Sequence, residues 1–213
     1  MNFKFALPLV GLLAVGCDDN PGKGKPQAEV SSATPTTAAA APAAGALTYA
    51  LSQDNSKVEF VGAKVTGKHP GSFGKFSGSV VVAPGAIESG KVMIDIEMGS
   101  LTTDQEKLNG HLKSADFFDA DKFPKATFVT TSVKASGGGG ALFTVSGNLT
   151  LKGVTKTVTF PATIKVAEDA VDASAEFAIN RKDWGIVYPG KPDDLIKDEV
   201  LLKLTIHATR PKS

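Results

Sequence analysis

The sequence has little of several residue types, and each scarcity excludes a class of protein. Its 213 residues include one cysteine, so no disulfide can form within the chain and a zinc site built from several cysteines is excluded. Lys and Arg number 23 against 22 Asp and Glu, which gives a formal net charge of +1. This balance gives no electrostatic reason to expect nucleic acid as a partner, or a basic patch that holds an anionic membrane.

Motifs for catalysis and metal binding are also missing. His111 has no G-x-S-x-G segment or second cysteine to serve as a nucleophile beside it. His69, His111 and His207 form no H-x-x-x-H pair, and the acidic residues within 116–121 lack the glycine and final glutamate of a calcium loop. We therefore expect no enzyme activity, no metal and no cofactor. His111 is expected to cap or hydrogen-bond a helix–loop junction.

The first residues have the form of a secretory signal. Lys4 supplies a positive charge, residues 5–15 are mostly apolar, and small residues lead into Cys17. The apolar stretch is too short to cross a bilayer as a mature helix. A buried helix with an incidental cysteine is the alternative interpretation. The position of the only cysteine favours a secretory signal, because the segment then resembles a bacterial lipoprotein signal. This resemblance implies a signal peptide over residues 1–16 and lipidation of Cys17.

A lipidated Cys17 implies a location as well as an anchor. Two or more lipid chains hold a protein stably on a membrane without a transmembrane helix. Asp18 and Asp19 follow directly and resemble an inner-membrane retention signal. We expect the mature chain on the periplasm-facing side of the bacterial cell envelope, with the inner membrane favoured.

Residues 17–46 are expected to be the lipidated cysteine followed by a flexible tether rich in Pro, Ala and Thr. From residue 20 to 46 there is no aromatic residue, and Val30 is the single branched aliphatic. Such a segment buries too little apolar surface to offset the entropy of ordering it. A helix over residues 38–44 is the alternative, but Pro42 interrupts it.

The remainder, residues 47–213, reads as one all-β domain. Val92, Ile94 and Ile96 alternate with polar residues, as expected for a strand with one apolar and one wet face. Turn-forming residues separate the candidate strands, which cover residues 58–65, 77–83, 92–98, 126–133, 143–151, 158–164, 175–179 and 200–206. About eight such strands can close into an antiparallel barrel with room for one small ligand.

One stretch departs from the alternation. Leu108 and Leu112 lie four residues apart, which predicts a short helix over Asp104–Ser114 across one end of the barrel. Thr102 or Thr103 could cap its start, and Thr103 and Glu106 have the spacing of a capping box. The phenylalanines that follow, between residues 117 and 123, are expected to plug or line a barrel mouth.

Three segments, in order, resemble motifs of the YceI family. They read HLKSADFFD at residues 111–119, GNLTLKGVTK at 147–156 and FAINRKDWG at 177–185. The resemblance extends over residues 47–208. It implies a lipocalin-like barrel of eight antiparallel strands with a long apolar lipid inside: a polyisoprenoid, an isoprenoid quinone or a fatty-acid derivative.

The alternation and the resemblance together predict the ligand contacts. Inward apolar side chains should line the tunnel, and the predicted set is Phe60, Phe76, Ile94, Ile96, Phe117, Phe128, Phe143, Leu149, Phe160 and Phe177. Arg181 and Asp183 have two interpretations. The first, which we favour, is an ion pair or backbone hydrogen bonds that fix a strand turn, and the second is a polar clamp on a lipid head group. A filled barrel that serves as a structural or protein-interaction domain of the envelope is the alternative function. An enzyme that acts on a lipid is the third.

Overall fold

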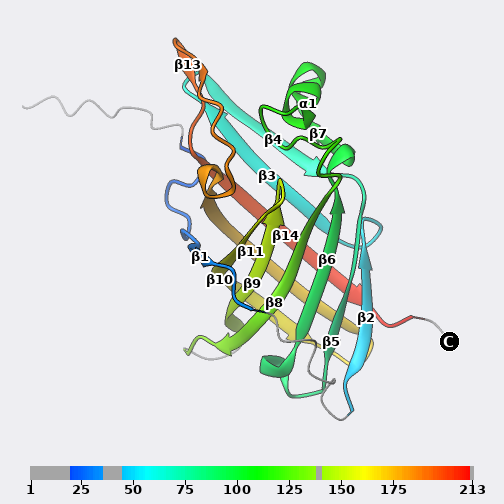
Figure 1. Cartoon of the computed structure of the whole chain (residues 1–213). Coiled ribbons are helices and arrows are strands. Elements are labelled where there is room, and N and C mark those ends of the chain that lie inside the picture. The colour runs from blue at the N-terminus through cyan, green and yellow to red at the C-terminus, as the bar shows by residue number, and fades with distance from the viewer. Residues whose placement is uncertain (1–19, 36–44, 138–140, 212–213) are drawn as a thin grey trace, which may run out of the picture.

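Eight antiparallel strands close into a barrel. Around the ring they run β2 (Leu47–Ser52), β5 (Phe76–Val82), β6 (Lys91–Glu97), β8 (Lys125–Ala135), β9 (Leu142–Leu151), β10 (Val154–Val166), β11 (Ala170–Asn180) and β14 (Glu199–Thr209). The pairing of Thr209 with Ala50 joins β14 to β2 and completes the ring, as Figure 1 shows. The computed structural model describes residues 20–35, 45–137 and 141–211. The predicted closed eight-stranded barrel with one short helix is confirmed.

The remaining elements extend the barrel at one end, which we call the mouth (Figure 1, top). Strand β3 (Lys57–Lys64) pairs with β14, and β4 (Gly67–Phe73) and β7 (Leu101–Thr103) extend the sheet beyond it. The mouth also carries helix α1 (Glu106–Lys113) and the hairpin of β12 (Gly190–Lys191) with β13 (Asp194–Leu195). Three short 3-10 helices complete the described elements: η1 (Ile87–Ser89), η2 (Met98–Ser100) and η3 (Arg181–Trp184).

Helix α1 lies within the range that the leucine spacing predicts, but it begins differently. Its N-cap is Gln105, which makes no side-chain cap bond. Thr103 instead accepts a hydrogen bond from the Gln105 backbone N–H, with 3.2 Å between nitrogen and Oγ1. The expected capping box is therefore replaced by a turn one step before the helix.

The apolar faces of the strands meet in two buried clusters. One gathers around Tyr49, Ile94 and Ile206, and the other around Phe160, Phe177 and Trp184. Trp184 is completely buried, and its indole N–H donates to the Leu149 carbonyl oxygen at 3.1 Å. Full burial of each such side chain contributes about 1.5–3 kcal/mol, so the inward faces are the main source of the barrel's stability.

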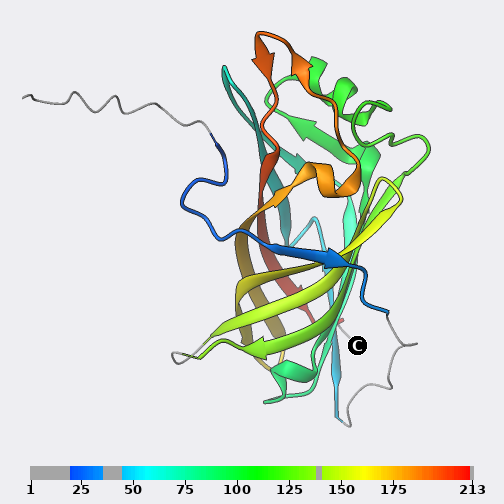
Figure 2. The same cartoon turned by 60° about the vertical axis from the view of Figure 1, so that its left-hand side comes forward.

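The N-terminal residues that the structure describes lie on the barrel. Strand β1 (Glu29–Ser32) pairs antiparallel with Lys156–Thr159 of β10, and Figure 2 shows this blue segment running across the wall. The structure thus corrects the expectation of a flexible tether for residues 20–35. Composition counts only apolar side chains, whereas this segment is held largely by backbone hydrogen bonds to a strand edge. We call residues 20–35 the N-terminal strap.

The predicted signal peptide, residues 1–16, and Cys17 lie outside the described ranges, so both remain predictions. Within the described ranges, no helix combines the length and the hydrophobicity needed to cross a bilayer.

Candidate functional site

An apolar cavity of about 200 Å³ runs along the inside of the barrel. Side chains from β3, β5, β6, β8, β9, β10, β11 and β14 form its wall. Ile87 and Gly90 line it at the end away from the mouth, and Phe118 and Ile186 line it at the mouth. The cavity follows from the strand period, because every second residue of each strand points inward and most of these residues are Val, Ile, Leu or Phe.

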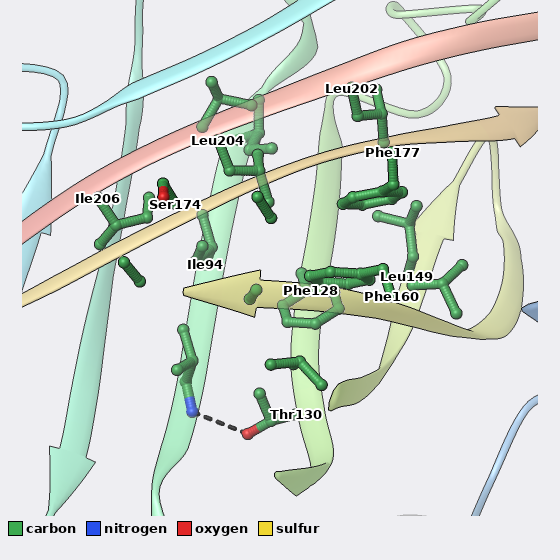
Figure 3. Close-up of a pocket in the computed structure, with 18 of the residues that line it drawn as sticks. Ile94, Phe128, Thr130, Leu149, Phe160, Ser174, Phe177, Leu202, Leu204 and Ile206 are labelled. Carbon is green, nitrogen blue, oxygen red and sulfur yellow. Dashed lines mark hydrogen bonds between the residues drawn. The ribbon is translucent and has the colours of Figure 1, made fainter. Parts of the chain in front are cut away.

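Three polar side chains belong to the wall, and two of them are buried and bonded to protein. Thr130 Oγ1 accepts a hydrogen bond from the Val92 backbone N–H at 2.9 Å, the dashed line in Figure 3. Ser174 lies on β11 and is exposed. Arg181 is the third. Within the described residues, no buried side-chain nitrogen or oxygen lacks a hydrogen-bond partner. A ligand in the cavity would therefore contact mainly the carbon atoms of apolar side chains.

Arg181 is held by its own surroundings. Its side chain is buried and donates to the carbonyl oxygens of Ile186 at 2.6 Å and Lys197 at 3.1 Å. Nη2 also lies 3.0 Å from Asp198 Oδ1. Burial lowers the pKa of Arg181 from its ordinary value, and the charge of Asp198 partly opposes that shift. The geometry matches the ion-pair interpretation, with Asp198 as the partner in place of Asp183, and it fixes the turn that follows β11.

Seven of the ten predicted contact residues line the cavity. They are Phe60, Ile94, Ile96, Phe128, Leu149, Phe160 and Phe177. Figure 3 shows Ile94, Phe128 and Phe177 converging on one space from different strands. Phe160 stacks on Phe177 with ring centroids 4.0 Å apart and planes inclined by 11°. Phe128 lies tilted against Phe160 at 5.9 Å. These three rings form an aromatic wall on one side of the space.

Three predicted residues are placed elsewhere. Phe76 and Phe143 are buried and share the inward faces of β5 and β9, but neither lines the cavity. Phe76 is the first residue of β5 and Phe143 the second of β9, so both lie near strand ends. Alternation identifies the face of a strand and carries no information on depth along the barrel. Phe117 lines a second hollow at the mouth.

This second hollow, which we call the vestibule, is more polar than the cavity. It shares Phe60, Phe118 and Arg181 with the cavity, so the two spaces adjoin. The ring of His111 packs edge-on against Phe117 and Tyr188, with centroids 4.9 and 5.0 Å away. His111 Nε2 lies 3.2 Å from Asp116 Oδ2, at the helix–loop junction where the sequence predicts a hydrogen bond.

Sequence reasoning missed several wall residues for two reasons. Leu202, Leu204 and Ile206 share one face of β14 and line the cavity, and their alternation was a signal that could have found them. Ile186 and Tyr188 lie in a loop between η3 and β12. A loop has no period, so nothing in the sequence around these two residues indicates that they face the vestibule.

The histidines occupy three separate surface pairs. His69 lies 3.1 Å from Asp104, and His207 lies 2.6 Å from Asp172. Together with the pair of His111, each histidine has one aspartate as its neighbour. No group of three His, Cys, Asp or Glu in the described part of the chain is arranged to hold a metal ion.

Comparison with known proteins gives matches over most of the barrel. The family model described as the YceI-like domain matches residues 49–208. A UPF0312 protein of Pseudomonas putida strain W619 is 36% identical over 126 residues, which are 56% of this chain and 65% of that protein. The protein YceI of Salmonella arizonae is 33% identical over 148 residues, covering 67% of this chain and 74% of that one. The chain thus spans somewhat less than two thirds of the Pseudomonas protein.

Solved structures agree on the fold. Burkholderia cenocepacia BcnA superposes with a TM-score of 0.66 at 29% identity, covering 75% of this chain and 99% of that one. A polyisoprenoid binding domain from Saccharophagus degradans, implicated in plant cell wall breakdown, gives a TM-score of 0.62 at 19% identity, covering 78% and 99%.

Proposed function

Since the chain belongs to the family of YceI-like domains, we propose that its barrel binds one long apolar lipid and performs no chemistry on it. The candidate lipids are a polyisoprenoid, an isoprenoid quinone and a fatty-acid derivative. The description of the Saccharophagus neighbour as a polyisoprenoid binding domain supports this choice of class.

The observation that carries the proposal is the apolar wall of the cavity. Thr130 and Arg181, the two buried polar residues of that wall, are already bonded to protein groups. A ligand therefore gains mainly from burial, at about 0.8 kcal/mol for each buried methylene, and needs no directional partner. For a long unbranched or prenyl chain, this favourable free energy increases with the length of chain that is buried. The space also argues against the alternative of a filled barrel.

Substitution at one cavity position tests the proposal. Leu202 lines the cavity, whereas the neighbouring Lys203 on β14 points to the other face of the strand. Leu202→Trp should fill part of the space and lower the fraction of chains with bound lipid by weakening binding about tenfold, because overpacking costs about 1–3 kcal/mol. Native mass spectrometry of protein purified from its own host measures that fraction.

Lys203→Trp is the matched control and should retain the same lipid as the unsubstituted chain. Extraction and identification of the lipid would assign its class. A bare protein mass that stays unchanged after incubation with ubiquinone and with palmitate would contradict lipid binding.

We also propose that the chain is anchored through a lipid on Cys17 on the periplasm-facing side of a bacterial membrane, with the inner membrane favoured. The strap begins at residue 20, so Asp18 and Asp19 would separate the anchor from a segment that lies on the barrel. Three residue steps reach about 10 Å, so the barrel would be held close to the bilayer. Cys17→Ser should move the protein from the membrane fraction to the soluble periplasmic fraction. Retention of the Cys17→Ser protein in the membrane fraction would contradict the anchor.

A further inference from the structure

The barrel wall has a seam between β10 and β11. These strands pair over four residue pairs, from Thr163–Ser174 to Val166–Val171. Beyond Thr163, β10 stays with β9 while β11 follows β14. Pro161 lies in β10 at this point and has no N–H to donate to a neighbouring strand. The sequence itself therefore weakens the ladder at the place where the two strands part.

The wall is thin at the seam. A depression on the outer surface lies over residues 161–163 of β10 and 174–176 of β11. Ala162, Ser174 and Ala175 line both this outer depression and the inner cavity. Leu204 of β14 also lines both spaces, so on β10 and β11 themselves two alanines and a serine stand between the apolar interior and the outside, where most of the wall has Val, Ile, Leu or Phe.

The N-terminal strap fills the part of the seam that lies toward η3. Residues 29–32 pair with Lys156–Thr159, on the edge of β10 that β11 has left. On its other side, the strap reaches β11, where Ala28 N–H donates to the Ala178 carbonyl and Ala178 N–H donates to the Pro26 carbonyl, both at 2.9 Å. The strap is therefore an additional segment of the barrel wall that lies between β10 and β11.

Few apolar contacts hold the strap in place. Ala28 is its buried member of the cluster that contains Val158, Phe160 and Phe177, and Val30 packs partly against the same cluster. Lys25 Nζ lies 2.6 Å from Glu176 Oε2, but both side chains are more than a third exposed, so the pair contributes little. Pro21 is also buried, and Thr34 bonds the side chains of Asn148 and Thr157 at the far end of the strap. These contacts are still far fewer than those of a barrel strand, so the strap should open at a lower free energy than the barrel strands.

We propose that the β10–β11 seam is a lateral entry port for the apolar chain of the ligand, and that the strap is its gate. Release of the strap frees the edge of β10 beside Val158 and Phe160, two residues that line the cavity. A long chain can then enter sideways, without threading lengthwise past α1 and the β12–β13 hairpin at the mouth. This inference rests on the proposed lipid-binding function.

A reversible crosslink tests the gate. Glu29 of the strap and Thr159 of β10 are directly opposed, a separation that a disulfide can span. The full chain carrying Cys17→Ser, Glu29→Cys and Thr159→Cys is mixed with the fluorescent fatty acid cis-parinaric acid, and uptake is followed by stopped-flow. Oxidation should slow uptake at least about tenfold and leave the final amplitude unchanged, since it blocks the route and leaves the cavity intact. Reduction should restore the rate.

The matched control keeps Thr159→Cys and moves the second cysteine to Ser146 of β9, which is also directly opposed to Thr159. Strands β9 and β10 stay paired whether or not the strap opens, so oxidation of this variant should leave uptake unchanged. Equal uptake rates for the oxidised and reduced strap variants would overturn the gate and leave lipid binding standing. Absence of uptake by the chain without added cysteines would overturn lipid binding and the port together.

Amide hydrogen exchange on the unsubstituted chain gives an independent readout. The backbone N–H of Ala28 should exchange at least about tenfold faster than the paired amides of β9 and β10. Equal protection of the strap and these two strands would overturn the gate even if a cysteine variant failed to fold.

Discussion

The wall between β9 and β10 and the wall between β10 and β11 are built in opposite ways. The first ladder runs without a break from Val154–Leu151 to Thr163–Leu142, and a tight turn through Lys152 and Gly153 joins its strands. The second has four pairs and is completed by a segment distant in sequence, since Thr34 bonds Thr157 across 123 positions. Strand β10 thus has a strong side, where it pairs continuously with β9, and a weak side, where it pairs only briefly with β11. The difference lies in backbone pairing, because both sides present apolar residues to the cavity.

The largest expected effect comes from crowding the strong side. A Cβ added at Gly147 on β9 would lie 2.3 Å from Phe128 Cζ and 2.9 Å from the Val129 carbonyl oxygen. The Val129 carbonyl cannot withdraw without disturbing the ladder, so Gly147→Ala should lower the free energy of unfolding by about 2–3 kcal/mol. Urea denaturation measures this change. An unchanged midpoint would show that the strong side is more compliant than its pairing indicates.

The same substitution on the weak side should have a smaller global effect. A Cβ at Gly22 in the strap would lie 2.8 Å from the Ala178 Cβ and 2.7 Å from Glu199 Oε2. The strap can lift away, so Gly22→Ala should lower the free energy of unfolding by less than about 1 kcal/mol and speed amide exchange at Ala28. A loss as large as that of Gly147→Ala would mean that the strap and the barrel unfold as one unit.

The smallest effect is a pH dependence of strap opening. The hydrogen bond from Lys25 lowers the pKa of Glu176 below its ordinary 4.5, and Lys203 adds to the shift. A carboxyl group with a lowered pKa in the closed form stabilises that form above pH 4.5, and this contribution is lost as the pH falls through the lowered value. Exchange at Ala28, corrected for the intrinsic rate, should therefore speed up as the pH falls below 4.5.

Two variants divide this effect between the strap and the barrel. Lys25→Gln removes the partner on the strap and should weaken the pH dependence. Lys203→Gln removes the partner on β14 and should leave most of it. If both variants show the same pH dependence of exchange at Ala28, the charge of Glu176 affects the stability of the barrel and not the opening of the strap.

Alternation in the sequence was enough to predict most of the ring, because strands with one buried face repeat every two residues. Strand β2 was not singled out, although Tyr49 and Leu51 alternate within it and are buried. The depth of a residue along the barrel depends on the stagger between strands, which the sequence of one strand does not encode. For this reason Phe76 and Phe143 were predicted to line the cavity but do not. The resemblance supplied the lipid class, which alternation does not carry.

The strap could not be predicted from composition. Its buried side chains, Pro21 and Ala28, are small, and most of its other contacts are hydrogen bonds made by its backbone. The available edge of β10 exists because β11 leaves it near Pro161, a fact about the assembled sheet. Arg181 is a similar case, since its partner Asp198 lies 17 positions away across a turn.

The strap has a practical consequence for anyone who trims the protein. A domain cut to the family match at residues 49–208 loses residues 20–35, so the backbone groups of Lys156–Thr159 that face the strap lose their partners and form a sheet edge. Such an edge is a template for a strand from a second molecule. The shortened protein should therefore self-associate at high concentration through β10, and a dimer seen in such a preparation would reflect the cut rather than the native chain.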